Sequence, residues 1–155
     1  MNSIPINALL NDLKSDGQTV RETATQKLWQ LWFEQKGVVG VQILNRSRLL
    51  IDAGDIDQAE LILTQLIQTM PDFAEAWNQR AILYFMEHRH RKAISDCQQA
   101  IRLNPFHFGA LHGMGLCHLL LAEHRQAAQA FRQALEIQPH SVENQRMLLE
   151  CVAHL

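Results

Sequence analysis

The sequence of 155 residues is short of charge, of long apolar runs and of cysteine, and each shortage excludes a class of protein. Charged residues make up 19% with a net charge of −2, so the chain lacks the positive surplus that attracts nucleic acid. No run approaches the roughly 18 apolar residues of a membrane-spanning helix, which excludes membrane insertion. Cys97, Cys117 and Cys151 are an odd number without C-x-x-C spacing. They predict neither a zinc motif nor a disulfide framework but buried thiols in a reducing compartment.

The sequence also lacks the marks of secretion and of catalysis. Residues 1–17, "MNSIPINALLNDLKSDG", have no basic region followed by an apolar stretch, so they do not resemble a signal peptide. We therefore expect a cytoplasmic protein, although a chain from which a signal peptide had been removed would look the same. No serine or cysteine lies in a motif with a base and an orienting acid, and no spacing of ligands fits zinc. The sequence thus predicts a protein that is not an enzyme and that holds no cofactor or metal.

What the sequence does have is a regular internal repeat. Three of its four prolines, Pro71, Pro105 and Pro139, are equally spaced. An alanine stands twelve positions before each proline, at Ala59, Ala93 and Ala127. Within each block, apolar residues recur with a helical period in two stretches of about 14 residues. A helical hairpin of this size cannot bury its apolar face alone, so we expect the hairpins to stack on one another.

These positions resemble the tetratricopeptide repeat, a unit of about 34 residues with the pattern W-x₂-L-G-x₂-Y…A-x₃-F…P. The second block matches best, with Trp77, Ala81, Tyr84, Ala93, Cys97, Ala100 and Pro105. Phrases such as "AEAWNQRA" are similar to small bacterial proteins of this family. The resemblance implies an all-α fold, an α-solenoid of about three hairpins in a single domain over residues 1–155. Its expected parts are N-terminal capping helices forming a degenerate hairpin over 1–39, repeats over 40–73, 74–107 and 108–141, and a capping helix over 142–155 with Ser141 as its N-cap.

Residues 104–115, "NPFHFGALHGMG", contain three glycines whose spacing fits neither a dinucleotide-binding loop nor a P-loop. In the repeat register, Asn104 and Pro105 form a turn and the glycines lie on the helix that follows. Gly115 falls where the two helices of a hairpin approach closely. Gly109 and Gly113 are not required by repeat packing, and their spacing places them on one helix face. We expect them to leave a depression into which another chain or helix fits.

In this family the first helix of each hairpin lines a concave groove, and the resemblance therefore implies where a partner binds. The candidate groove residues are Arg48, Glu75, Asn78, Ile82, Gly109, His112, Gly113 and Leu116. Members of the family that grip acidic chaperone tails do so with a clamp of basic and amide residues. The corresponding positions here hold Leu44, Arg48, Gln79, Gly109 and Gly113, so that clamp is absent. The groove that remains is mostly apolar and suits an apolar or amphipathic segment.

Two functions follow from these features. The first is a non-enzymatic interaction module, an adaptor or scaffold that holds a partner protein or peptide in the groove. The alternative is a self-assembling structural protein, a homo-oligomer joined end to end or through the Trp29, Trp32 and Phe33 cluster. Charge motivates this alternative, because residues 1–78 carry 6 Lys and Arg against 10 Asp and Glu, whereas residues 79–155 carry 8 against 6. An enzyme or a metal-binding protein ranks third.

Overall fold

The computed structural model describes residues 5–155, and all the regular structure within that range is helical. The predicted all-α fold is thereby confirmed, whereas residues 1–4 of the expected N-terminal cap lie outside the described residues. The helices are α1 (Ile6–Asp12), α2 (Gln18–Phe33), α3 (Gly37–Asp52), α4 (Ile56–Thr69), α5 (Ala74–Met86), α6 (His90–Leu103), α7 (Phe108–Leu120), α8 (His124–Ile137) and α9 (Val142–Ala153). No helix in this range is long and apolar enough to cross a membrane.

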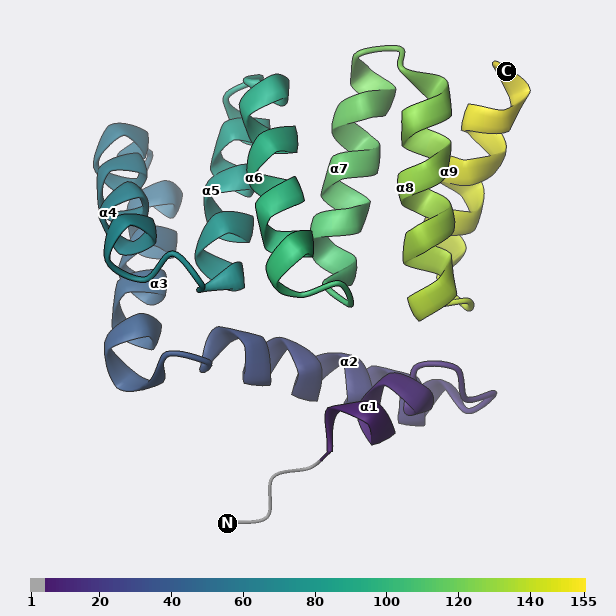
Figure 1. The fold of residues 1–155 in the computed structure, drawn as a ribbon, viewed down its shortest axis with the longest axis horizontal. Helices are drawn as coiled ribbons and strands as arrows, with labels where there is room; N and C mark the ends of the chain where they lie inside the picture. The colour runs from purple at the N-terminus through teal and green to yellow at the C-terminus, as the bar shows by residue number, and fades with distance from the viewer. Residues whose placement is uncertain (1–4) are drawn as a thin grey trace.

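Three antiparallel hairpins, α3–α4, α5–α6 and α7–α8, stack side by side, and α9 follows the last of them (Figure 1). The second helix of each hairpin starts at residue 56, 90 or 124, so the helices keep the regular spacing of the prolines. The turn inside each hairpin contains a residue in the left-handed region, at Gly54 (φ 80°), His88 (φ 58°) and Ala122 (φ 58°). These three positions are also one repeat apart. The chain therefore reverses direction with the same backbone geometry in each hairpin.

Small residues set the spacing of the helices within each hairpin. A Cβ atom on Gly115 would lie only 2.7 Å from the Phe131 ring of α8, so only glycine allows this approach. The predicted close contact at Gly115 is therefore confirmed. Between the first two hairpins the buried core includes Leu63, Phe73 and Leu83, none of which is accessible to solvent.

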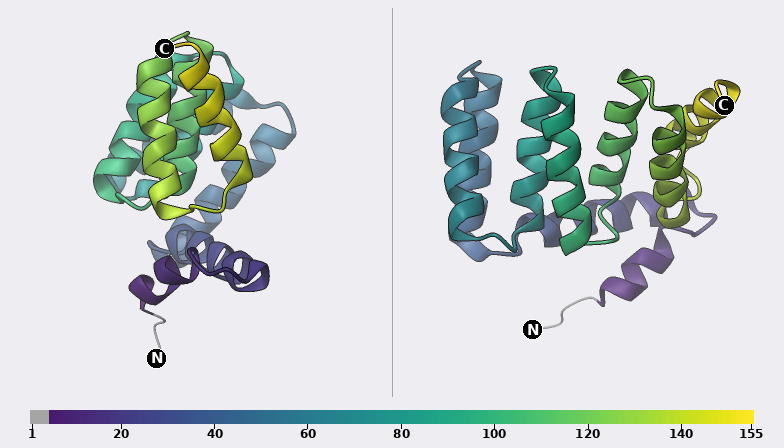
Figure 2. Two further views of the ribbon diagram at one scale, coloured as in Figure 1. Left: turned by 90° about the vertical axis from the view of Figure 1, so that its right-hand side faces the viewer. Right: turned by 45° about the horizontal axis from the view of Figure 1, so that its top comes forward.

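The N-terminal helices occupy a position that the repeat register does not predict. The expectation over residues 1–39 was a degenerate hairpin capping the end of the stack. Instead, α2 runs along the lower edge of the stack, beneath the ends of the later hairpins, and α1 packs against it (Figures 1 and 2). Gly37, with φ of 68°, lies at the junction where the chain turns from α2 into α3. The apolar face of α2 provides the physical reason, because Leu28 and Trp32 are buried with Phe108 of α7.

Helix α9 has one buried face and one apolar face that no other helix of residues 5–155 covers. Ser141 caps its first turn by accepting a hydrogen bond from the Asn144 backbone N–H at 3.2 Å, as the sequence predicts. Cys151 packs against α8 in the last core cluster. On the other side, however, Val142 and Leu149 are 66% and 71% exposed. Helix α9 thus corresponds to the first helix of a hairpin, with its partner-facing side open.

Candidate functional site

Two adjoining cavities lie on the concave side of the stack, between α2, α5 and α7. The first, here called the polar cavity, has a volume of about 480 Å³ and is lined by Trp29, Gln30, Phe33, Glu34, Arg48, Glu75, Asn78, Gln79 and Ile82. The second, the apolar cavity, has a volume of about 260 Å³ and is lined by Trp29, Asn78, Ala81, Ile82, Phe85, Ala93, Cys97, Gly109, His112, Gly113, Leu116 and Cys117. The eight residues predicted from the sequence all line one cavity or both.

Glu75 lines the polar cavity, and three hydrogen bonds from other side chains of the protein hold its carboxylate in place. Its carboxylate accepts hydrogen bonds from Asn78 Nδ2 (3.2 Å), Gln79 Nε2 (2.9 Å) and His107 Nε2 (2.8 Å). The Glu75 side chain is 1% exposed, and no Lys or Arg within residues 5–155 forms an ion pair with it. The sequence predicted a polar contact point for a partner at Glu75. In the structure its oxygens instead accept hydrogen bonds from side chains of the same chain. These hydrogen bonds offset the free-energy cost of burying the carboxylate.

His107 connects this network to the start of α7. The His107 Nδ1 atom accepts a hydrogen bond from the backbone N–H of Ala110 at 3.0 Å, so the side chain caps the helix. Because Nδ1 is an acceptor, the ring proton is on Nε2, which donates to Glu75. The imidazole is therefore neutral. It is also fully buried and stacks on the Trp32 ring at a centroid distance of 4.8 Å.

His107 was not among the residues predicted from the sequence, although the repeat register contains a signal for it. Ser141, which was recognised as an N-cap, lies exactly one repeat after His107. The cap position therefore recurs between repeats, and histidine is an uncommon residue there. The bond from His107 to Glu75 had no comparable signal, because it joins two repeats through side chains alone.

The two unexplained glycines have different surroundings. A Cβ on Gly109 would lie 2.4 Å from Cη2 of Trp29, whereas one on Gly113 would meet only Cys97 Sγ, at 3.7 Å. The depression at Gly109 is thus filled by Trp29 of the same chain, which corrects the expectation that a partner occupies it. Gly113 leaves open space in the wall of the apolar cavity.

Three helices supply the remaining groove side chains. Arg48 of α3 is exposed, and its guanidinium lies over the Phe33 ring of α2 at 5.4 Å. His112 of α7 is held by α9, because its Nδ1 lies 2.6 Å from Asn144 Oδ1. Ile82 of α5 is 43% exposed and forms the shared rim of the two cavities.

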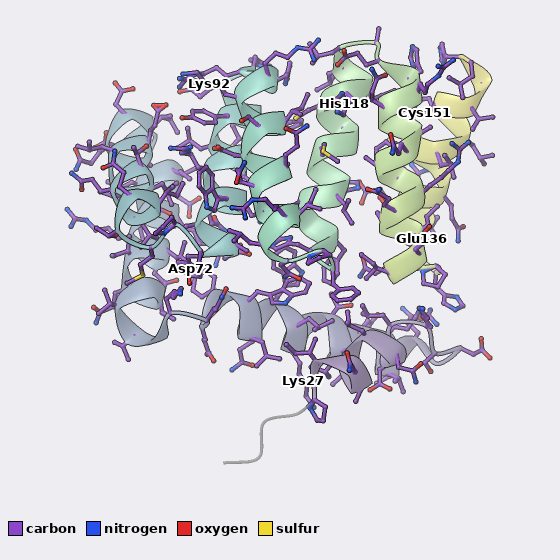
Figure 3. The ribbon with its side chains drawn as sticks, in the orientation of Figure 1. Lys27, Asp72, Lys92, His118, Glu136 and Cys151 are labelled. Carbon is purple, nitrogen blue, oxygen red and sulfur yellow. The ribbon has the colours of Figure 1, made fainter. Side chains whose placement is uncertain are left out.

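Helix α2 adds a wall to the groove that the repeat register did not include. Trp29, Phe33 and Glu34 of this helix line the polar cavity, and Trp29 lines the apolar cavity as well. Lys27 lies on the other side of α2, away from the stack (Figure 3). Leu44, which the register placed in the groove, is fully buried in the core instead. The groove therefore begins one helix earlier in the chain than the sequence indicated.

The thiols in this region are shielded from solvent. Cys97 and Cys117 line the apolar cavity, and both are buried. Desolvation by burial raises the pKa of Cys117 to about 11 and raises the pKa of Cys97 further, with smaller contributions at Cys97 from charge repulsion by Cys117 and Asp96. Within residues 5–155, no three His, Cys, Asp or Glu side chains converge in a way that could hold a metal ion.

Comparisons with known proteins identify the repeated unit. A tetratricopeptide repeat model matches residues 74–107, and a second model of the same description matches residues 108–141. A TPR repeat-containing protein of Rhizobium etli is 36% identical over 77 residues, which cover 50% of this chain and 38% of that protein. A BBSome complex member BBS4 homolog of Drosophila melanogaster is 24% identical over 120 residues, which cover 77% of this chain and 24% of that protein. The chain therefore spans well under half the length of these curated relatives.

Solved structures share the fold at low sequence identity. The first TPR domain of Spaghetti (RPAP3), bound to the HSP90 peptide SRMEEVD, superimposes with a TM-score of 0.70 at 22% identity, covering 73% of this chain and 90% of that chain. The Sgt2 TPR domain from Aspergillus fumigatus gives 0.66 at 20% identity, covering 72% of this chain and 76% of that chain. At these identities the likeness concerns the arrangement of the helices and not the residues of the groove.

Proposed function

Because residues 74–107 and 108–141 are tetratricopeptide repeats, we propose that this chain is a non-enzymatic interaction module that holds an extended partner segment in the groove between α2, α5 and α7. The observation that carries the proposal is the pair of adjoining cavities, since one is apolar and the other lined by polar side chains. A peptide segment could place an apolar side chain in the first and polar groups along the second. The Spaghetti domain, which has the same fold, holds an HSP90 peptide.

The chemistry of the groove supports binding without catalysis. The pKa values of the Cys97 and Cys117 thiols are raised by burial, so thiolate nucleophiles are scarce near neutral pH. The Glu75 carboxylate is engaged by three internal donors, which leaves it poorly placed to accept a proton from a substrate. Three free thiols also favour a reducing compartment, and we place the protein in the cytoplasm on that basis.

A single substitution tests the groove. In Gly113→Arg the new side chain would fill the apolar cavity, while its Cβ meets only Cys97 Sγ at an ordinary 3.7 Å. We expect this variant to keep its helical content and to lose capture of any groove-bound partner from a cell lysate, measured by pull-down and mass spectrometry.

Ser95→Arg on α6 is the matched control, because it adds the same charge at an exposed position outside both cavities. A partner retained equally by the wild type and both variants would contradict groove binding.

Self-association through α9 is a second candidate, because a separate observation favours it. Val142, Leu149 and Val152 occupy the repeat positions of Phe108, Gly115 and His118, and Gly115 lies against Phe131 in the second helix of its hairpin. The three α9 residues are 66%, 71% and 44% exposed. A second copy of α9, packed antiparallel, would cover this strip as the second helix covers the first in the hairpins α5–α6 and α7–α8.

Sedimentation equilibrium over a range of protein concentrations tests this candidate. If α9 pairs with its copy, Leu149→Lys shifts the dimer to monomer, whereas the exposed Leu61→Lys on α4 leaves the mass unchanged. A wild-type chain that stays monomeric at the highest concentrations would remove self-association from consideration. The clustering of Trp29 and Trp32 against His107 and Phe108 makes the N-terminal helix a poorer site for pairing than the sequence suggested.

A further inference from the structure

The direction of the hydrogen bonds around Glu75 determines which groups the polar cavity presents to a partner. A carboxylate can only accept, so the side-chain amides of Asn78 and Gln79 must turn their N–H groups towards it. Their carbonyl oxygens, Oδ1 and Oε1, then point the other way. Neither oxygen accepts a hydrogen bond from any other group within residues 5–155.

These oxygens are unpaired but accessible to the cavity. The whole Asn78 residue is 2% exposed and Gln79 9%, and both line the polar cavity. Among the described residues, the fully enclosed side-chain atoms without a partner are the Nδ1 atoms of His90 and His124 only. The unpaired oxygens of Asn78 and Gln79 therefore reach the cavity surface. A group that binds there must donate hydrogen bonds, because leaving a buried carbonyl oxygen unpaired on binding is costly.

Charge in the polar cavity favours a donor that is positively charged. All three partners of Glu75 donate hydrogen bonds to its oxygens, which is the hydrogen-bond pattern of a carboxylate. No cation neutralises it at short range, because His107 is neutral and Arg48 instead lies over Phe33. Glu34 adds a second carboxylate at the rim. The Trp29 ring adds an aromatic surface suited to a cation, whereas the Phe33 ring is already covered by the Arg48 guanidinium.

We propose that the groove binds a partner segment with a Lys or Arg side chain in the polar cavity and an apolar side chain in the adjoining apolar cavity. The inference rests on the proposed function and adds the chemistry of the partner. The ammonium or guanidinium group donates to Asn78 Oδ1 and Gln79 Oε1 and pairs with Glu34. The partner's apolar residue enters between Leu116 and Gly113, where the walls are almost entirely carbon and sulfur. Such a segment is basic. It is thus opposite in charge to the acidic chaperone tails, whose clamp of basic and amide residues this chain lacks.

A library of random twelve-residue segments tests both that the groove binds a segment and that this segment is basic. The segments are displayed inside a carrier loop, so that no free terminus contributes charge. The wild-type protein is used as bait, and segments that also bind Gly113→Arg are removed. We expect enrichment of segments in which Lys or Arg lies near a large apolar residue. Enriched segments with acidic or uncharged consensus sequences would overturn the inference but leave groove binding intact. No enrichment over Gly113→Arg would overturn both.

Two glutamates on α2 provide a test variant and its matched control for measuring how tightly the selected segments bind. Glu34 accepts from Gln30 Nε2 and lines the polar cavity, while Glu22 accepts from Gln18 Nε2 in the same i, i+4 arrangement and lies outside it. Glu34→Gln should weaken binding of a basic segment by about threefold to tenfold in a fluorescence anisotropy titration. Glu22→Gln should leave it unchanged. Replacing the segment's basic residue with norleucine should remove the difference between Glu34→Gln and wild type.

An equal effect of Glu34→Gln and Glu22→Gln would overturn the placement of the cation, because it would show only a response to net charge. Both variants alter exposed side chains, so loss of folding does not confound them. Glu75→Gln is less suitable, since a glutamine amide would direct a donor at groups that themselves donate.

Discussion

At the scale of single residues, Gly109 and Gly113 show how one residue type serves two purposes on one helix face. Gly109 allows the Trp29 ring of α2 to rest against the α7 backbone, whereas Gly113 borders an open cavity. Both glycines lower the intrinsic stability of the helix by about 1 kcal/mol relative to alanine. Only Gly109 offsets this loss of helix stability with a packing contact, the one to Trp29.

Alanine substitution should therefore change stability in opposite directions at these two sites. Gly109→Ala would place a Cβ 2.4 Å from Trp29 and should lower the free energy of unfolding by roughly 1–3 kcal/mol, because the ring must move. Gly113→Ala meets no close atom and should raise that free energy by up to about 1 kcal/mol. Urea denaturation followed by circular dichroism measures both. If the two variants proved equally stable, the contact between Trp29 and α7 would not exist in solution.

The residue scale also shows the limit of interpretation from sequence. Glu75 and Asn78 line the polar cavity, but the sequence suggested two exposed polar points. Their burial depends on His107, which lies 32 residues from Glu75 and reaches it only once α5 and α7 are side by side. Helical periodicity assigns a residue to a face of its own helix and carries no information about what covers that face.

At the scale of elements, α2 is the helix that departs most from the repeat. In a simple solenoid each hairpin contacts its neighbours alone, so stability is the sum of local terms. Here α2 adjoins α3 in sequence, yet Trp29 and Trp32 pack on His107 and Phe108 at the start of the third repeat. Helix α2 therefore links the first repeat to the third and makes their unfolding interdependent.

Hydrogen–deuterium exchange should reveal this link. Trp32→Ala removes a 7%-exposed ring that stacks on His107 and should increase amide exchange in α7 as well as in α2, while α4 changes little. Trp77→Ala is the control for loss of a tryptophan ring, because Trp77 packs in a cluster of α5, α6 and α7 residues without α2 and its indole N–H donates to the Pro71 carbonyl, so exchange in α2 should not change. Faster exchange confined to α2 after Trp32→Ala would show that the link carries no stability.

At the scale of the whole molecule, part of the charge asymmetry that suggested association is used within the stack. Arg89 Nη1 in the basic half lies 2.6 Å from Glu60 Oε1 in the acidic half, joining the second hairpin to the first. Arg91 forms a bidentate pair with Glu123 between the second and third hairpins. This pair, with the contact from His118, lowers the pKa of the Glu123 carboxyl. Such partly exposed pairs contribute little to stability, although each joins two adjacent hairpins.

The sequence by itself determined the repeating part of this protein. The constant interval between Pro71, Pro105 and Pro139, the alanines before each proline and Gly115 located three hairpins, their turns and their internal packing. These features are readable because each depends on residues close in sequence and recurs from repeat to repeat. The eight residues that the same register assigned to the groove line the two cavities, whereas the α2 residues that also line them were not predicted.

Tertiary structure alone decided the parts that do not repeat. The course of α2 depends on burying Leu28 and Trp32 against Phe108, two repeats later in the chain, and no periodicity encodes such a contact. The same holds for the Glu75–His107 bond, which orients two amides and so determines the polarity of the groove. The physical reason is common to both: side chains far apart in sequence meet only after the hairpins have stacked, and their meeting decides which groups are left to face a partner.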